Sequence, residues 1–158
     1  MADESAIEAD DGEGERMDAT DDGQPDQLQF NAQVIEQFRA GGEVQGLHRE
    51  RLVLLTTTGR RSGEQITAPM MFHLDGGVPV VIASNMGALA HPGWFLNLEA
   101  DPEVTVELPD KAYRSRAVVL DGAEYDRVWA DVTRDSPFFL EHQAQTPRRI
   151  PLVSLPAL

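Results

Sequence analysis

Two adjacent arginines in a glycine-flanked turn are the first residues of this sequence with a clear chemical use. Arg60 and Arg61 lie between Gly59 and Gly63, and glycine readily takes the positive φ angles of tight turns. A guanidinium group binds phosphate or carboxylate through paired, charge-assisted hydrogen bonds, each worth roughly 1.5 to 3 kcal/mol. The turn is therefore either an anion site or an exposed hairpin loop with two solvated arginines, and spacing alone leaves both interpretations open.

A second group of interest is the segment His91-Pro92-Gly93-Trp94-Phe95. Pro92 suits the first position of a short helix, whose first turn has free N–H groups. His91 is therefore either part of an anion site or an ordinary residue at a helix start. Trp94 and Phe95 can hardly both be buried on one face of so short a helix. One ring could therefore face a planar ligand, but packing in the core is the favoured interpretation.

Several well-known catalytic motifs are missing from the sequence. The four histidines, His48, His73, His91 and His142, show neither the i, i+3 nor the i, i+4 spacing of a metal site, so we expect no metal. The chain has no cysteine, which excludes disulfides and a cysteine nucleophile. A nucleophile elbow, a Walker loop and a dinucleotide fingerprint are also missing, so acyl transfer, P-loop chemistry and a Rossmann cofactor site lack support.

The elements that must position these groups are mostly strands. Alternating and β-rich runs predict strands at residues 52–58, 66–72, 78–83, 103–108, 113–120 and 150–153. We expect the fourth and fifth to form a hairpin, and Pro151 to keep the last at a sheet edge. Apolar spacing predicts helices at residues 28–40, from Pro92 onward, at 123–133 and at 138–145. Mostly antiparallel strands with peripheral helices, an α+β arrangement, predict a small barrel.

Charge divides the chain into two parts. Residues 1–28 contain eleven acidic residues and one arginine, a net charge of −10, which leaves −4 of the formal −14 for residues 29–158. We expect residues 1–27 to be a disordered acidic tail and residues 28–158 to be a single domain. The mildly acidic domain argues against nucleic acid or an anionic membrane as a partner.

Composition also bears on the environment of the protein. One lysine against twelve arginines, together with the acid excess, fits a protein kept soluble at high salt, although a GC-rich genome also favours arginine. No run approaches the roughly 20 apolar residues of a membrane span, and the N-terminus lacks the features of a signal peptide. We therefore expect a cytoplasmic protein.

Three stretches together resemble the deazaflavin-dependent nitroreductase family, small split β-barrel enzymes that use coenzyme F-420. They are LLTTTGRRSG, SNMGALAHPGWFLNLEADPEVTVEL and RRIPL, and the resemblance covers about residues 29 to 155. It implies an antiparallel, FMN-binding-like split β-barrel of six or so strands that passes a hydride from reduced F-420 to a quinone, enone or nitro compound. The anionic phosphate and oligoglutamate tail of that coenzyme agree with the independent interpretation of the arginine turn.

The resemblance also implies a set of site residues. The cofactor's tail would lie against Thr58, Arg60, Arg61, Ser62, Gly63, Glu64 and Gln65. The deazaflavin ring would be bordered on one side by Ala83, Ser84 and Asn85, and on the other by Gly93, Trp94, Phe95, Leu96 and Asn97. The acceptor pocket would be lined by Phe138, Phe139 and His142.

Several positions depart from the family pattern. Nitro-reducing members carry pocket tyrosines where a gap-free match puts Ser136, Phe139 and His142, and some members carry a lysine where Asn85 stands. His142 is the titratable group among the three, with a reference pKa of about 6.5, so it is the candidate catalytic proton donor, with solvent as the alternative. An FMN-binding split-barrel oxidoreductase and a non-catalytic cofactor-binding protein are the alternative functions. Small split barrels often pair, so a homodimer is considered.

Overall fold

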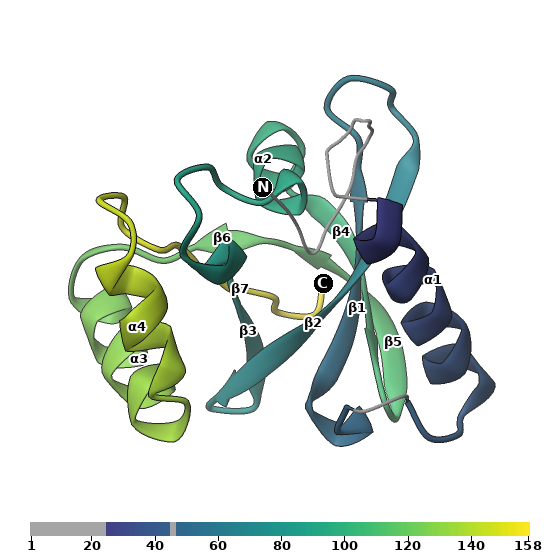
Figure 1. Ribbon diagram of the computed structural model, residues 1–158, viewed down its shortest axis with the longest axis horizontal. Coiled ribbons are helices and arrows are strands. Elements are labelled where there is room, and N and C mark those ends of the chain that lie inside the picture. The colour runs from purple at the N-terminus through teal and green to yellow at the C-terminus, as the bar shows by residue number, and fades with distance from the viewer. Residues whose placement is uncertain (1–24, 45–46) are drawn as a thin grey trace.

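A single curled antiparallel sheet dominates the computed structural model, which describes residues 25–44 and 47–158 (Figure 1). The predicted acidic tail lies almost entirely outside these residues. The described residues form seven strands in the order β5-β4-β1-β2-β3-β7-β6. Their bounds are β1 Leu52–Thr58, β2 Gln65–Asp75, β3 Val78–Ile82, β4 Glu103–Leu108, β5 Lys111–Arg116, β6 Val118–Val119 and β7 Leu152–Ser154.

Helices flank the sheet on both sides. They are α1 Pro25–Ala40, α2 Gly93–Ala100, α3 Gly122–Asp135 and α4 Phe138–Ala144, with short 3-10 turns η1 Arg49–Arg51 and η2 Asn85–Gly87. Figure 1 shows α3 and α4 together at one side of the sheet and α1 at the other. The predicted helices are confirmed to within a few residues at each end. Helix α1 ends where predicted because Gly41, at φ 86°, takes the left-handed conformation that stops a helix.

Strand β2 joins the two halves of the sheet. Its first part pairs with β1 as far as Met71, opposite Leu52, and its last part pairs with β3 from Phe72 to Asp75. Strand β2 therefore pairs with β1 along its first part and with β3 along its last part. Past Met71 the side of β2 that faced β1 no longer has a strand beside it, and η1 lies there instead.

The run predicted as one strand, residues 113–120, divides between the two edges of the sheet. Its first part, β5, pairs with β4, and its second part, β6, pairs with β7 after a break at Ala117. After β7 the chain returns to β5, where Leu158 N–H donates to the Arg114 carbonyl at 3.1 Å. The two edges are thereby brought together, and the predicted small antiparallel split β-barrel is confirmed.

The predicted edge position of the last strand is wrong. Strand β7 pairs with β3 on one side and with β6 on the other, so β6 is the edge. Pro151 precedes the strand, and its carbonyl accepts a hydrogen bond from Ala83 N–H at 3.0 Å. A proline immediately before a strand costs no hydrogen bond of the ladder, so the strand can be internal.

Strand β1 is buried on both faces. Val53 and Leu55 pack in the main core with residues of α2, whereas Leu52 and Leu54 pack with Val34 and other residues of α1. A third cluster fastens α3 and α4 to β3 and β7. The strand that precedes the arginine turn is therefore fixed by packing on both of its faces.

Candidate functional site

The arginine turn is a tight loop between β1 and β2. Gly59 N–H donates to the Glu64 carbonyl at 2.7 Å, and Gly63, at φ 74°, donates to the Gly59 carbonyl at 2.9 Å. A Cβ on Gly59 would lie 2.7 Å from Ser62 Oγ, so a larger residue there would displace this hydroxyl. Ser62 Oγ also accepts from Glu64 N–H at 3.1 Å. Backbone geometry and one hydroxyl thus fix the shape of the loop.

Asn97 of α2 fastens the loop to the rest of the site. Its Oδ1 accepts from the backbone N–H of Arg60 at 3.1 Å and from Arg60 Nη1 at 2.9 Å. Its Nδ2 donates to Thr57 Oγ1 at 3.2 Å, and the side chain is only 1% exposed. A buried amide with both ends satisfied holds its partners firmly. The predicted tail and ring segments are therefore connected through Asn97.

The remaining polar residues of the turn lie at its surface. Arg61, Glu64 and Gln65 are exposed, and Gln65 Nε2 donates to Thr58 Oγ1 at 2.9 Å. Arg60 is exposed as well, although one edge of its guanidinium is engaged by Asn97. Two guanidinium groups at an exposed loop with a single carboxylate nearby in sequence provide a cationic surface for an anion.

A second cluster forms where β3 ends, and sequence reasoning missed its central residue, Arg148. Its Nε donates to the Ala88 carbonyl at 2.9 Å and its Nη1 to the Ala83 carbonyl at 3.1 Å. Its Nη2 donates to the Ser84 carbonyl at 2.6 Å. One guanidinium therefore fixes both ends of the loop that contains η2. The RRIPL stretch includes Arg148, but nothing in its spacing indicates these partners.

Arg148 also determines the state of His91. Its Nη1 lies 3.0 Å from His91 Nδ1, and because guanidinium only donates, Nδ1 must be the acceptor. Burial, and to a smaller extent the charge of Arg148, lowers the pKa of His91 below the ordinary value of 6.5. The imidazole is therefore neutral and already engaged, which argues against the anion-site interpretation of its Nδ1.

His142 reaches the same cluster from α4. Its Nδ1 lies 3.3 Å from Ser84 Oγ, and burial lowers its pKa despite the opposing effect of Glu141. Gly87 is what lets α4 approach so closely. At φ 80°, it would place a Cβ 2.9 Å from the His142 carbonyl. The structure thus brings two predicted site residues, Ser84 and His142, into contact.

The favoured interpretation of the two aromatic rings of α2, packing in the core, is confirmed, and the alternative that one ring faces a ligand is wrong. Trp94 is 4% exposed and Phe95 is 2% exposed, and both belong to the main core. Both can be buried because α2 packs over the sheet, with the two rings edge to face at 6.3 Å between centroids. Leu96 stays partly exposed. Any wall that α2 offers to a ligand is therefore made by its backbone and Leu96 rather than by the rings.

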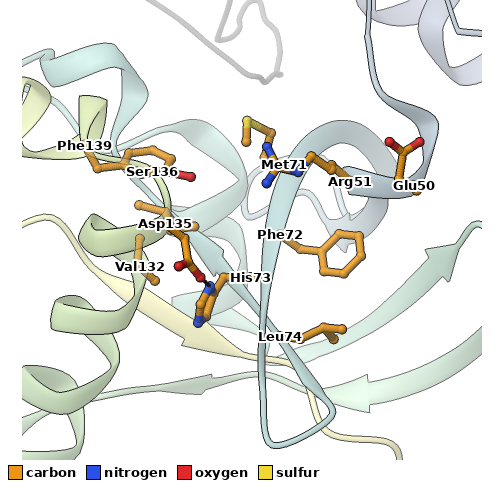
Figure 2. A pocket seen from close by; sticks show the side chains of 11 residues that line it. Glu50, Arg51, Met71, Phe72, His73, Leu74, Val132, Asp135, Ser136 and Phe139 are labelled. Atoms are coloured by element: carbon orange, nitrogen blue, oxygen red, sulfur yellow. Dashed lines mark ion pairs between the residues drawn. The ribbon is translucent and has the colours of Figure 1, made fainter.

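A pocket of about 280 Å³ lies beside this cluster, between β2 and the corner of α3 and α4 (Figure 2). Of the three predicted acceptor-pocket residues, Phe139 lines the pocket, whereas His142 and Phe138 do not. His73 and Asp135, which sequence reasoning did not select, face each other in the pocket with Nδ1 and Oδ2 at 3.5 Å. The two are far apart in sequence, so spacing carries no signal for this pair.

The described residues hold neither a cluster suited to a metal ion nor a helix suited to a membrane. Nowhere in residues 25–44 and 47–158 do three or more histidine and acidic side chains gather in a way that would hold a metal ion. Within the same residues, each helix is too short or too polar to cross a membrane.

Comparisons with known proteins identify the family of this chain. The family model described as F420H(2)-dependent quinone reductase matches residues 29–156. An F420H(2)-dependent quinone reductase of Mycobacterium tuberculosis is 30% identical over 106 residues, covering 65% of this chain and 71% of that protein.

Two solved structures are similar in both sequence and fold. The F420-H2-dependent reductase FDR-A is 33% identical, with a TM-score of 0.63, covering 70% of this chain and 100% of that one. A protein described as a domain-swapped dimer is 32% identical, with a TM-score of 0.65, covering 77% of this chain and 93% of that one. The sequence-based resemblance is thus confirmed: this chain belongs to the F420H(2)-dependent quinone reductase family, whose members are oxidoreductases that use coenzyme F-420.

Proposed function

We propose that this protein transfers a hydride from reduced coenzyme F-420 to an organic acceptor, and that the acceptor is a quinone. Family membership supports the coenzyme and the class of reaction. The related protein of Mycobacterium tuberculosis is named a quinone reductase, which supports the acceptor. One observation carries the proposal: Asn97 of α2 hydrogen-bonds Arg60 and thereby joins the cationic turn to α2.

The residues present suit this coenzyme. Arg60 and Arg61 offer exposed guanidinium groups to its anionic tail, and the fixed loop geometry around Ser62 and Gly63 presents them together. The predicted binding residues Thr58, Arg60 to Gln65, Ala83 to Asn85 and Gly93 to Asn97 keep this role in the proposal, with Trp94 and Phe95 acting from the core by positioning α2. The bound coenzyme would supply the hydride, and the protein would supply binding and orientation.

His142 is the proposed proton donor to the reduced acceptor. Its contact with Ser84 Oγ holds the ring beside the proposed ring-binding segment. Because burial lowers its pKa below 6.5, the charged form becomes scarcer as the pH rises. The rate with His142 as donor should therefore increase as the pH falls below 6.5. If the rate of a His142→Gln variant depends on pH in the same way as that of the natural protein, the proton comes from solvent and not from His142.

The cofactor site is tested by a double substitution, Arg60→Ala with Arg61→Ala. We expect F-420 binding, followed by its fluorescence, to weaken at least about tenfold, since each guanidinium contributes roughly 1.5 kcal/mol when it contacts an anion. A matched control is Arg114→Ala with Arg116→Ala, two exposed arginines of β5 that pair with Glu103.

Three outcomes separate the possible interpretations of that test. Selective loss in the Arg60 and Arg61 variant supports the proposal. Equal affinity in all three proteins would show that the turn is ordinary surface. Micromolar binding of FMN, with none of F-420, would reject the coenzyme proposed here and favour the FMN-binding alternative.

Several finer assignments belong to the same proposal. Enones and nitro compounds are proposed as further acceptors, and a cytoplasmic location and a tolerance of high salt follow from the composition. The domain is proposed to span residues 28–158 with the acidic segment 1–27 outside it. Nucleic acid is not a proposed partner. A homodimer is proposed because a similar solved protein forms a domain-swapped dimer.

A further inference from the structure

The two guanidinium groups of the arginine turn lack the carboxylate partners that other exposed arginines have. Five of those arginines each lie 2.7 to 3.7 Å from a carboxylate oxygen: Arg39, Arg114, Arg116, Arg127 and Arg134. Within residues 25–44 and 47–158, neither Arg60 nor Arg61 has a carboxylate at such a distance, and Arg60 contacts the neutral amide of Asn97 instead. The positive charge of the turn is therefore not balanced by the described part of the chain.

Helix α1 begins toward the end of the sheet at which this turn lies. The far end of the helix is held at the start of β1, because the Phe38 carbonyl accepts from Arg49 Nη2 at 3.1 Å and η1 leads directly into β1. Figure 1 shows the helix ending there, near η1, and beginning toward the end of the sheet where the arginine turn joins β1 to β2. The residues that precede Pro25 therefore join the domain on the side of the arginine turn.

Those preceding residues, 1–24, are strongly acidic and are called the acidic arm below. The arm contains ten acidic residues and one arginine, a net charge of −9. Asp18, Asp21 and Asp22 occupy three of the seven positions immediately before Pro25. Seven residues span at most about 25 Å, and groups on so short a tether meet a neighbouring site at an effective concentration on the order of millimolar.

We propose that the carboxylates of the acidic arm bind the arginine turn of the same chain, so that an anionic ligand of the turn must displace the arm. Opposite charge and the position of Pro25 support this occupant. Exposed ion pairs are individually weak and are screened by salt, so the contact is reversible and sensitive to ionic strength. The arm thus acts as a competitor built into the chain, and it favours ligands with several negative charges over ligands with one.

For its effect on coenzyme F-420 the inference rests on the proposed function, whereas the contact between arm and turn does not depend on it. The anionic part of the coenzyme would compete with the arm for Arg60 and Arg61. If the arm covers the turn in about two thirds of the molecules, the apparent Kd is about three times the intrinsic Kd.

The first test measures the Kd of F-420 by its fluorescence, with the full-length protein in about 10 mM NaCl, where the Debye length is about 30 Å. Replacing Asp18, Asp21 and Asp22 together by asparagine should lower the Kd by about threefold. A second variant, in which all ten acidic residues of the arm become amides, should lower it at least as much. In about 1 M NaCl, where the Debye length is about 3 Å, the natural protein and both variants should bind equally.

Two controls separate a contact from a general effect of net charge. The first replaces Asp110, Glu124 and Asp126 by their amides, which removes the same number of charges from exposed positions outside the arm. Glu124 and Asp126 belong to α3, which lies on the other side of the sheet from α1 (Figure 1), and this variant should keep the natural Kd. The second control combines Arg60→Ala and Arg61→Ala with the arm substitutions, which should then no longer change the Kd.

A second measurement detects the contact without the coenzyme. The amide signals of Arg61, Ser62 and Gly63 are followed by ¹⁵N nuclear magnetic resonance in the coenzyme-free protein. They should differ between the natural protein and the two arm variants in about 10 mM NaCl and coincide in about 1 M NaCl. The amide signal of Lys111, at the start of β5, should be the same in all three proteins.

The failures of the two proposals are distinguishable. If F-420 does not bind but the amide signals of the turn change as expected, the proposed function fails and the contact stands. If the amide signals of the turn are the same in the natural protein and both arm variants, the arm does not bind the turn and the inference is overturned. An equal gain in F-420 affinity from the Asp110, Glu124 and Asp126 variant would also overturn it, because net charge alone would then explain the effect.

Discussion

Replacing Arg148 by methionine is the most informative single perturbation of this site. The change keeps most of the aliphatic stem and removes the guanidinium, which donates to the carbonyls of Ala83, Ser84 and Ala88 and to His91 Nδ1. Three charge-assisted bonds to carbonyls, at roughly 1.5 to 3 kcal/mol each, set an upper bound of about 4.5 to 9 kcal/mol. Water can replace part of these bonds because Arg148 is only partly buried.

We therefore expect Arg148→Met to lower the free energy of unfolding by about 2 to 4 kcal/mol. A domain of this size has roughly 5 to 15 kcal/mol of stability, so the variant should still fold. The Tm should fall by roughly 6 to 16 °C. Since the guanidinium also holds the segment around Ser84, F-420 binding should weaken in the folded variant.

The adjacent residue supplies the control. Arg149 is exposed, and its guanidinium lies 3.9 Å above the ring centroid of Tyr125. Arg149→Met should cost only about 0.5 to 1 kcal/mol, typical of a solvent-exposed cation–π contact, and should leave F-420 binding unchanged. Urea unfolding at pH 7.5 measures both variants. A loss below about 1 kcal/mol for Arg148→Met, or equal losses for the two variants, would refute the inference that Arg148 organises this end of the sheet.

Three further predictions follow from buried or constrained groups. Asn97→Leu should cost about 1 to 3 kcal/mol, because the backbone N–H of Arg60 loses its acceptor, and an unchanged urea midpoint would contradict this. Gly87→Ala should cost about 1 to 3 kcal/mol by thermal melting, because φ is 80° and the new Cβ would lie 2.8 Å from Gln145 Oε1; an unshifted Tm would contradict it. The lowered pKa of His91 means that the unfolded chain binds more protons, so its contribution to stability is present above pH 6.5 and is lost as the pH falls through that value. Stability should drop there by at most about 1.4 kcal/mol per pH unit from this group, and His91→Gln should flatten the slope of urea unfolding free energy between pH 8 and 5; equal slopes would contradict it.

Much of the local structure was predictable from the sequence. Alternating β-branched and apolar residues identified strands such as β1 and β4, and apolar residues at helical spacing identified α1 and α3. Gly41 marked the end of α1, and the glycines of the arginine turn marked the loop between β1 and β2. These predictions are correct because backbone preference and the periodicity of buried residues are properties of short segments.

Pairing between distant segments was not predictable in the same way. Residues 113–120 read as one strand because both halves have β-forming composition, yet the sheet assigns them to opposite edges. Pro151 suggested an edge strand, but it precedes β7 rather than interrupting it. Trp94 and Phe95 were expected to compete for one buried face, but α2 packs against the sheet so that both rings enter the main core.

By itself, the sequence determined the charged turn with its two arginines, the acidic N-terminal composition and the order of strands and helices, because each of these is encoded by neighbouring residues. Only the tertiary structure decided that Asn97 fastens Arg60, that Arg148 holds the loop after β3, and that His73 meets Asp135 in a pocket. The physical reason is that such contacts join residues far apart in the chain. Their geometry depends on how the whole sheet curls, and residue type and spacing carry no record of that.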